Sequence, residues 1–246
     1  MGGGRAVVER CDVLAVGPHP DDVELGCGGT VARLAKGGVR VGILDLTAGE
    51  LGTRGDVTVR AREAEAAARA LGVSWRSCLA LPDGGIRASD SDQVEKVIAA
   101  LRRARPRVLL VPHADDPHPD HGEAAALLRR VFFLSGLARF LPDLGSAHRP
   151  TLVLAYPGAR QLLRPSLVVD ISAHVGAKRE ALAAHASQFD KAAGAATRLA
   201  SGHFLAAVEG RDRACGNLVG CEFGEGLAAV GTPAADELAW LFGGAR

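Results

Sequence analysis

Two short segments of the sequence combine histidine, aspartate and proline in a way that suits metal-dependent hydrolysis. The first runs from His19 to Asp22 (His-Pro-Asp-Asp) and the second from His118 to His121 (His-Pro-Asp-His). Two imidazoles and one carboxylate are the usual protein ligands of a catalytic zinc ion, and three such ligands leave a coordination position for water. Because proline fixes φ, it also stiffens both segments. The pattern therefore predicts a divalent-metal site that activates water.

Each segment, taken alone, also has an ordinary structural explanation. His-Pro-Asp-Asp suits a turn whose aspartate caps the next helix. A second His/Asp cluster at an equivalent strand end argues against that explanation, because the fold then brings the two clusters together. A dinucleotide site is the competing use of the first segment. However, Gly26-Cys27-Gly28-Gly29 does not fit the G-x-G-x-x-G pattern, and the acidic run before it would repel a pyrophosphate.

The segments around these motifs alternate between apolar, strand-like runs and amphipathic, helix-like runs. Strands are predicted at 12–17, 39–46, 75–79, 107–111, 152–156 and 167–171. Helices are predicted at 28–36, 57–71, 90–105, 122–134, 175–186 and 195–209. Apolar strands separated by helices indicate βαβ units around a parallel sheet that is covered on both faces. Ligands bind at the carboxyl ends of such strands, where both motifs fall.

Composition places the chain among ordinary globular proteins. Its 246 residues include 29 Lys plus Arg and 28 Asp plus Glu, which gives a formal net charge of +1, and 48% of the residues are hydrophobic. Near-neutral charge and only 4% aromatic residues argue against a nucleic-acid partner. The unbroken alternation of elements predicts a single domain over residues 1–246, in which residues 1–10 form a flexible tail.

Cysteine usage and hydropathy predict the compartment. The five cysteines are an odd number and form no C-x-x-C motif, so neither a disulfide framework nor a cysteine zinc site is indicated. Free thiols are typical of a reducing compartment. The sequence shows no signal-peptide pattern and no apolar run of membrane-spanning length. We therefore expect a cytoplasmic protein with no membrane partner.

On these motifs, the sequence resembles the LmbE/PIG-L family of metal-dependent N-acetylglucosaminyl deacetylases. The similarity covers nearly the whole chain. It is greatest to the bacillithiol-biosynthesis branch, which removes acetyl from N-acetylglucosaminyl-malate, and it lies in the stretches at 19–30, 47–55, 185–188 and 211–226. The resemblance implies a Rossmann-like α/β fold. Its mostly parallel sheet has helices on both faces, and a C-terminal elaboration follows.

The resemblance also implies roles for six residues of the two motifs. One Zn²⁺ per chain would be bound by His19, Asp22 and His121, although iron, cobalt and manganese also accept such ligands. Asp21 matches the family's general base, His118 the histidine that stabilises the oxyanion, and Asp120 the residue that orients it. A carboxylate beside His118 would favour the protonated imidazole.

Substrate-binding candidates lie in two other stretches. Arg54, in the loop after the second predicted strand, suits a clamp on the carboxylate of a malyl group, or it is a solvated loop arginine. Glu50 and Thr53 are candidates for binding sugar hydroxyls. His185 and Gln188 are candidates for closing the far side of the pocket, and a helix C-terminal cation is an equally good explanation of His185.

Several other polar residues keep two interpretations. His113 suits either a pocket or a structural position, and Asp116 suits a partner of the metal ligands or a turn. Tyr156 ends a predicted strand, where packing in the core or at an interface is favoured. Arg60 and Arg62 begin a charged helix and are interpreted as its solvated face.

Other functions fit the sequence less well. An iron oxygenase also uses two histidines and a carboxylate, but this chain has an α/β pattern rather than a β-barrel pattern. A catalytically inactive binding protein is disfavoured because the residues matching the base and the oxyanion histidine are present. Within the deacetylases, GlcNAc-inositol, a chitooligosaccharide or an antibiotic intermediate is the alternative substrate. The resemblance further implies a homo-oligomer, with 199–242 as a candidate contact region.

Overall fold

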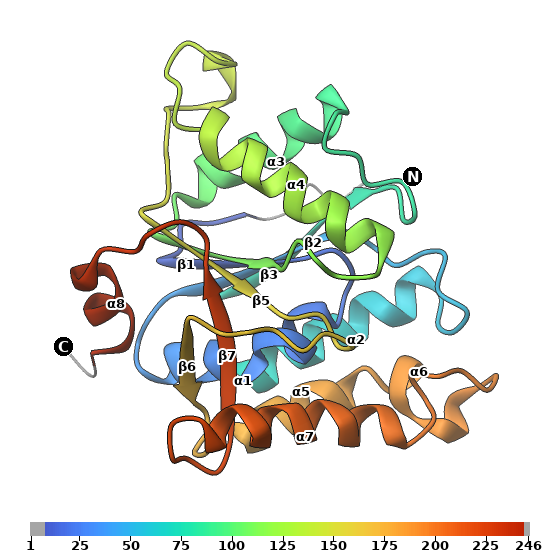
Figure 1. The fold of residues 1–246 in the computed structure, drawn as a ribbon. Helices are drawn as coiled ribbons and strands as arrows, with labels where there is room; N and C mark the ends of the chain where they lie inside the picture. The colour runs from blue at the N-terminus through green and yellow to red at the C-terminus, as the bar shows by residue number, and fades with distance from the viewer. Residues whose placement is uncertain (1–7, 244–246) are drawn as a thin grey trace.

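A mixed sheet at the centre of the protein sets the positions of the loops that carry the His/Asp motifs. The computed structural model describes residues 8–243 (Figure 1). Within these residues, seven strands form a sheet of order β3-β2-β1-β4-β5-β7-β6. Strands β1 to β5 run parallel, and β7 is antiparallel to both β5 and β6. The strands are β1 (Val13–Gly17), β2 (Val41–Thr47), β3 (Trp75–Leu81), β4 (Val108–Pro112), β5 (Leu152–Tyr156), β6 (Leu167–Asp170) and β7 (Gly224–Ala229).

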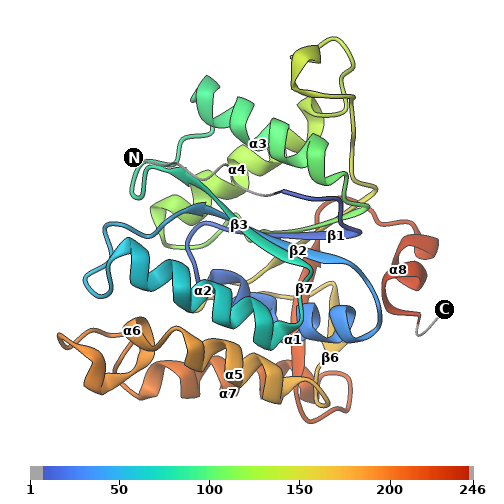
Figure 2. The same cartoon turned by 180° about the vertical axis from the view of Figure 1, so that it is seen from behind.

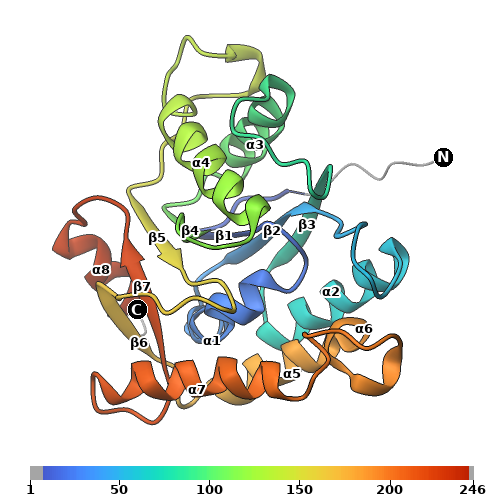
Figure 3. The same cartoon turned by 45° about the vertical axis from the view of Figure 1, so that its right-hand side comes forward.

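Helices cover both faces of the sheet, as predicted. Helices α3 and α4 lie on one face, and α1 and α2 lie on the other (Figures 1 and 2). Helices α5, α6 and α7 form a further layer outside α1 and α2 (Figure 3), which is the C-terminal elaboration. No helix among residues 8–243 has the length and apolarity that a bilayer span requires. The helices are α1 (Asp22–Lys36), α2 (Val57–Leu71), α3 (Ser91–Ala104), α4 (Pro119–Leu134), α5 (Val175–Ala184), α6 (Ala186–Phe189), α7 (His203–Asn217) and α8 (Ala235–Phe242), with short 3-10 turns η1 (Pro142–Leu144) and η2 (Lys191–Ala193).

The central strands are apolar throughout because both of their faces are covered. Every residue of β1 and β4 is buried. Successive side chains of a strand point to opposite faces. Accordingly, Leu14 and Val16 join the core under α3 and α4, whereas Val13 and Ala15 join the core under α1 and α2. This two-sided burial holds β1 and β4 rigidly, and with them the loops that follow.

The strand order reverses between β1 and β4, which lie side by side at the centre of the sheet. The connections from these two strands lead to opposite faces, which leaves a crevice at their carboxyl ends. The motif at 19–22 follows β1 directly, and the motif at 118–121 follows β4. The topology therefore brings together two motifs that are about a hundred residues apart in the chain.

Most predicted elements are confirmed, two of them with the predicted bounds (α2 and β5). The helix predicted at 195–209 is confirmed only over residues 203–209, because Gly202 has a φ of 75° and α7 begins at His203 and continues to Asn217. Strand β7 and helix α8 were not predicted. The predicted tail extends too far: residues 1–7 lie outside the described residues, but Val8 is buried in the core.

Candidate functional site

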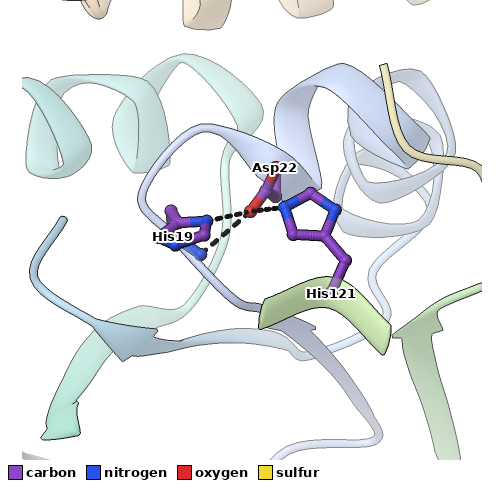
Figure 4. Close-up of side chains that lie close together, drawn as sticks. All are labelled: His19, Asp22 and His121. Atoms are coloured by element: carbon purple, nitrogen blue, oxygen red, sulfur yellow. Dashed lines mark hydrogen bonds and ion pairs between the residues drawn. The ribbon is translucent and has the colours of Figure 1, made fainter. Parts of the chain in front are cut away.

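The two His/Asp motifs converge on a single carboxylate oxygen. Oδ2 of Asp22 lies 3.2 Å from Nδ1 of His19 and 3.2 Å from Nε2 of His121 (Figure 4). The three ligand atoms lie within 4.8 Å of one another, and the three side chains are only 8–12% exposed. Two imidazole nitrogens and one carboxylate oxygen are the donors that a catalytic zinc takes, so this arrangement fits a divalent cation.

Each of the two imidazoles has a second carboxylate on its other nitrogen. Nε2 of His19 lies 3.0 Å from Oδ1 of Asp83, and Nδ1 of His121 lies 3.1 Å from Oδ2 of Asp116. Such partners fix the tautomer and the ring orientation of metal-ligating histidines. The position of Asp116 fits both of its interpretations, since it faces His121 and its Oδ1 also accepts a hydrogen bond from the backbone N–H of His118 (2.8 Å).

Sequence reasoning missed Asp83. This residue follows β3 in Pro82-Asp83-Gly84, at the same edge of the sheet as the two motifs. An acidic residue two positions after the end of a third parallel strand is the signal that could have identified it.

Asp21 is held in an unusual backbone conformation beside the predicted metal ligand Asp22. Its φ is 117°, a region that non-glycine residues rarely adopt, and its side chain is buried. Burial, together with the negative charge of Asp22, raises the pKa of Asp21 to about 6, while the positive charge of Arg60 opposes the rise. A carboxylate with this pKa is ionised at neutral pH and still basic enough to accept a proton.

Arg60 supports this loop from behind, so its interpretation as a solvated residue is wrong. Its guanidinium is buried and donates to the carbonyls of Gly49 (2.8 Å) and Pro20 (2.9 Å), with Asp21 Oδ2 at 3.5 Å. Gly49 has a φ of 69°, and a Cβ there would lie 1.8 Å from the guanidinium. Arg60 and Gly49 thus fix the backbone that carries Asp21. Arg62 is exposed, as expected.

His118 and Asp120 are arranged differently from the expectation. Nδ1 of His118 accepts a hydrogen bond from the backbone N–H of Asp120 (3.2 Å). The Asp120 carboxylate instead accepts from the backbone N–H of Gly84 (2.7 Å) and lies 3.3 Å from Nε2 of His19. Burial and the positive charges of His121 and His19 lower the pKa of His118. A neutral imidazole with its proton on Nε2 follows from this arrangement.

A second set of potential metal donors overlaps the first. Donor atoms of His19, His118 and Asp120 also lie within 4.8 Å of one another. Both sets share His19, but Asp22 lies 3.2 Å from its Nδ1, whereas Asp120 lies 3.3 Å from its Nε2.

A buried network of charges lies behind the loop. Arg76 donates to both oxygens of Asp45 (2.7 and 2.9 Å) and also to Glu24, which in turn lies 3.2 Å from Nε2 of His185. The His185 side chain is 0% exposed. His185 follows the last residue of α5 as its C-cap. Burial lowers its pKa, but the charge of Glu24 outweighs burial and raises the pKa, which agrees with the interpretation as a helix C-terminal cation. It does not line the cavity and is also a buried partner of the first turn of α1.

Helix α1 is kinked just beyond the site. Cys27 leaves helical geometry (φ −150°), and this frees the backbone N–H groups of Gly29 and Thr30. Both donate to the carboxylate of Glu225 in β7, at 2.9 and 2.6 Å. Glu225 thus acts as a cap for the second half of α1 and ties the helix to the C-terminal elaboration.

A cavity of about 530 Å³ opens over the metal donors. Its polar floor includes His19, Asp21, Asp22, Asp83, Asp116, His118 and His121, and its apolar wall includes Leu25, Leu51, Ala159, Leu199 and Phe204. This volume is within the range of pockets that hold small organic ligands. A larger cavity, of about 690 Å³, lies between the end of α1 and α8 and contains none of these groups.

Only one of the five substrate-binding candidates, all of them within residues 8–243, lines the 530 Å³ cavity: Gln188. Arg54 is buried behind the cavity and donates to the carbonyl of Asp190 (2.5 Å). Glu50 accepts a hydrogen bond from the backbone N–H of Asp83 (2.8 Å), and Thr53 is exposed. Because the loop of residues 50–55 points Arg54 inward, the structure does not support Arg54 as a clamp on the substrate.

Two further residues whose roles the sequence did not decide do not line the 530 Å³ cavity. His113 accepts a hydrogen bond from Nε2 of Gln161 (2.8 Å), in keeping with a structural position. Tyr156 is buried, and its hydroxyl donates to the carbonyl of Val16 (2.7 Å), so this residue belongs to the core.

Comparison with known proteins agrees with this geometry. The family model for PIG-L, described as GlcNAc-PI de-N-acetylase, matches residues 14–132, a range that includes both motifs. The diacetylchitobiose deacetylase of Thermococcus kodakarensis is 34% identical over 189 residues, which cover 72% of this chain and 70% of that protein. The chain belongs to the PIG-L family.

Other relatives support the same assignment. A GlcNAc-inositol deacetylase (1D-myo-inositol 2-acetamido-2-deoxy-alpha-D-glucopyranoside deacetylase) of Actinosynnema mirum is 28% identical, over 77% of this chain and 86% of that protein. The crystal structure of a conserved protein from Thermus thermophilus superposes with a TM-score of 0.81 and 37% identity, over 91% of this chain and 96% of that one. As a member of this metal-dependent PIG-L family, the protein is an N-deacetylase that hydrolyses an amide bond.

Proposed function

We propose that this PIG-L enzyme removes the acetyl group from an N-acetylglucosaminyl conjugate, and that N-acetylglucosaminyl-malate, in bacillithiol biosynthesis, is its substrate. The observation that carries the deacetylase reaction is the buried triangle of His19, Asp22 and His121, with Asp21 beside it on the cavity floor. The relatives named for chitobiose and GlcNAc-inositol share the N-acetylglucosaminyl group with this substrate. The malate conjugate rests on the sequence stretches shared with the bacillithiol branch.

In this proposal, His19, Asp22 and His121 hold the metal. When bound, Zn²⁺ polarises the acetyl carbonyl and lowers the pKa of a water molecule toward about 7. The outer carboxylates of Asp83 and Asp116 keep the two imidazoles turned toward the metal position.

Asp21 is the general base in this proposal. Its carboxylate lines the cavity, and its pKa of about 6 leaves it ionised at neutral pH. It takes a proton as water attacks the acetyl carbon, and it can return that proton to the leaving amine. The supports from Arg60 and Gly49 hold the carboxylate in place, so no reorganisation is needed when the proton moves.

His118 is the oxyanion donor. It lies on the cavity floor against His121, with 4.7 Å between ring centroids. Because the backbone N–H of Asp120 occupies Nδ1, the neutral ring carries its proton on Nε2 and can donate it to the developing negative charge. This role needs no protonated imidazole and therefore does not conflict with the lowered pKa of His118.

GlcNAc-inositol and a chitooligosaccharide are the alternative substrates within the same reaction. Two relatives of this chain are named for deacetylating these compounds, which supports them as candidates. Both compounds carry the N-acetylglucosaminyl group that is also present in the malate conjugate. A panel of N-acetylglucosaminyl-malate, GlcNAc-inositol and diacetylchitobiose, assayed for free amine after zinc loading, tests the proposal. The highest kcat/KM is expected for the malate conjugate. Turnover of none of the three by the metal-loaded protein would contradict the deacetylase assignment to this substrate class.

We also propose a cytoplasmic homo-oligomer. Part of the predicted contact region at 199–242 covers the sheet, because Leu227 and Leu241 are buried in the core. Leu218 and Val219, at the end of α7, are exposed and offer apolar surface for a contact between copies. Light scattering coupled to size-exclusion chromatography is expected to give a mass above that of one 25.4 kDa chain.

A further inference from the structure

The charges around the cavity are separated by depth. Its floor carries four acidic residues, Asp21, Asp22, Asp83 and Asp116, and one buried arginine, Arg60, which is already bonded to the carbonyls of Gly49 and Pro20. Its rim carries two exposed arginines, Arg160 and Arg198. Arg160 comes from the segment between β5 and β6, and Arg198 comes from the segment between η2 and α7. The rim is therefore positive although the chain as a whole is nearly neutral.

The two rim arginines have no protein partner. Neither guanidinium forms a hydrogen bond or an ion pair with any residue from 8 to 243, whereas most aspartates of the floor are held by histidines or backbone N–H groups. A single exposed arginine would be an ordinary surface residue. Two unpaired arginines from separate segments, both lining one cavity, give that cavity two guanidinium groups that are available to an anion.

The depth of the cavity indicates which part of the substrate meets the rim. The acetamide must reach the metal donors on the floor, so the group attached to the far side of the sugar lies toward the opening. Guanidinium groups bind carboxylates through parallel N–H···O hydrogen bonds. We propose that Arg160 and Arg198 form a subsite for a carboxylate on this attached group and select acidic conjugates; the inference rests on the proposed deacetylase function.

Arg54, which the sequence favoured for this role, supports the subsite from behind. Its Nη2 donates to the carbonyl of Asp190 (2.5 Å), and its own carbonyl accepts from Nε2 of Gln188 (2.6 Å). These bonds anchor the segment that leads to Arg198. Arg54 is thus a positioning residue, and its loss should affect acidic and neutral substrates alike.

The test compares one acidic and one neutral substrate. The zinc-loaded full chain and the double variant Arg160→Gln/Arg198→Gln are assayed on N-acetylglucosaminyl-malate and on methyl N-acetylglucosaminide at low salt. The variant is expected to lose about tenfold in kcat/KM on the acidic substrate, mainly through KM, and less than about twofold on the neutral one. Added salt should reduce the wild-type preference for the acidic substrate, because it screens exposed charges.

Two single variants serve as controls. Arg164→Gln removes the same charge from the same segment as Arg160, at an exposed position outside the cavity lining, and should leave both activities unchanged. Arg54→Gln should lower both activities by similar factors. Equal losses on both substrates in the double variant, or no loss on either, would overturn the subsite.

Failure of the proposed function has a different signature. If the wild-type protein deacetylates neither substrate, the proposed function is wrong, and calorimetric binding of N-acetylglucosaminyl-malate then decides the subsite by itself. Binding that weakens about tenfold in the double variant supports the subsite, whereas unchanged binding, or no binding to the wild type, contradicts it.

Discussion

Nε2 of His19 lies 3.0 Å from Oδ1 of Asp83, so a carboxylate at the end of β3 orients a histidine at the end of β1. The same carboxylate accepts a hydrogen bond from the backbone N–H of Leu51 (2.9 Å), a residue of the cavity wall. Asp83 therefore links the orientation of a metal ligand to the loop that borders the cavity. With Nε2 committed to Asp83, Nδ1 of His19 is the nitrogen left for the metal.

Replacing Asp83 should weaken metal binding. Asp83→Ala is expected to lower zinc affinity about 10- to 100-fold, because Nε2 of His19 loses the nearer of its two carboxylate partners and keeps only Asp120 at 3.3 Å. Competition with a chromophoric chelator measures this affinity. The matched control is Asp115→Ala, which removes an acidic side chain that is 88% exposed in the loop after β4. Equal zinc affinities for the two variants would show that Asp83 does not act on His19.

Asp21→Asn should retain the metal and lose turnover. The amide fills the same space but cannot accept the proton, so kcat should fall about 100- to 10,000-fold while zinc content stays at about one ion per chain. Elemental analysis and the amine assay measure the two quantities. A variant with the wild-type rate would place the base elsewhere.

The pH profile should report the same carboxylate. Asp21 acts only when ionised, so kcat/KM falls as the pH drops through its pKa, which is about 6 without a bound cation. A nearby metal charge favours the ionised form and lowers that pKa further. The acidic limb of the wild-type profile is therefore expected at or below pH 6. The residual activity of Asp21→Asn should lack this limb.

Metal binding itself should release protons. Burial lowers the pKa of both histidines, but the neighbouring carboxylates outweigh it. Asp120, Asp22 and Asp83 raise the pKa of His19 to about 12. Asp22 and Asp116 raise the pKa of His121 to about 10. Both imidazoles are thus protonated at neutral pH without metal. Binding requires free ring nitrogens, so it should displace about two protons per ion and strengthen as the pH rises. Calorimetry in buffers of different ionisation enthalpy counts the released protons. A metal affinity that does not change between pH 6 and 8 would contradict these pKa values.

The strand-end motifs were predictable because their geometry follows from topology alone. Once the sequence indicates parallel strands, His19 and His121 must share one edge of the sheet, whatever the details of packing. Asp83 was predictable by the same rule and was overlooked. By contrast, Arg160 and Arg198 carry no spacing signal, since loop arginines are common. The inward direction of Arg54 depends on where the segment at 188–194 packs.

The missed elements also have a physical reason. Strand β7 contains Gly224 and Gly226 and no β-branched residue, so its sequence has little strand preference. Tertiary contacts select these glycines: a Cβ on Gly224 would lie 2.6 Å from Cγ1 of Val168 and 2.9 Å from Cα of Gly216. The segment therefore forms a strand because it packs closely against β6 and α7. The hydrophobic pattern of its own sequence does not predict this conformation.

The buried charges behind the site should make Arg76 important for stability. Arg76 faces both Glu24 and Asp45, two carboxylates that are 0% and 3% exposed. Burial would raise the pKa of Glu24, but Arg76 and His185 hold it at about 2. Arg76→Met leaves both carboxylates buried without this cation. The free energy of unfolding should fall by about 3–5 kcal/mol at neutral pH, measured by urea denaturation.

The pH dependence of that loss separates charge from packing. In the wild type, the depressed pKa of Glu24 contributes stability that is present above its ordinary pKa of 4.5 and is lost as the pH falls toward 2. The variant lacks this contribution, so the gap between the two proteins should be largest at neutral pH and shrink as the carboxylates protonate. Arg40→Met, which breaks the exposed Arg40–Asp12 pair (2.8 Å), is the matched control and should change the free energy of unfolding far less than Arg76→Met does, because water screens the pair. A gap for Arg76→Met that stays constant between pH 7 and pH 3 would mean that the arginine stabilises the protein through its aliphatic packing rather than its charge.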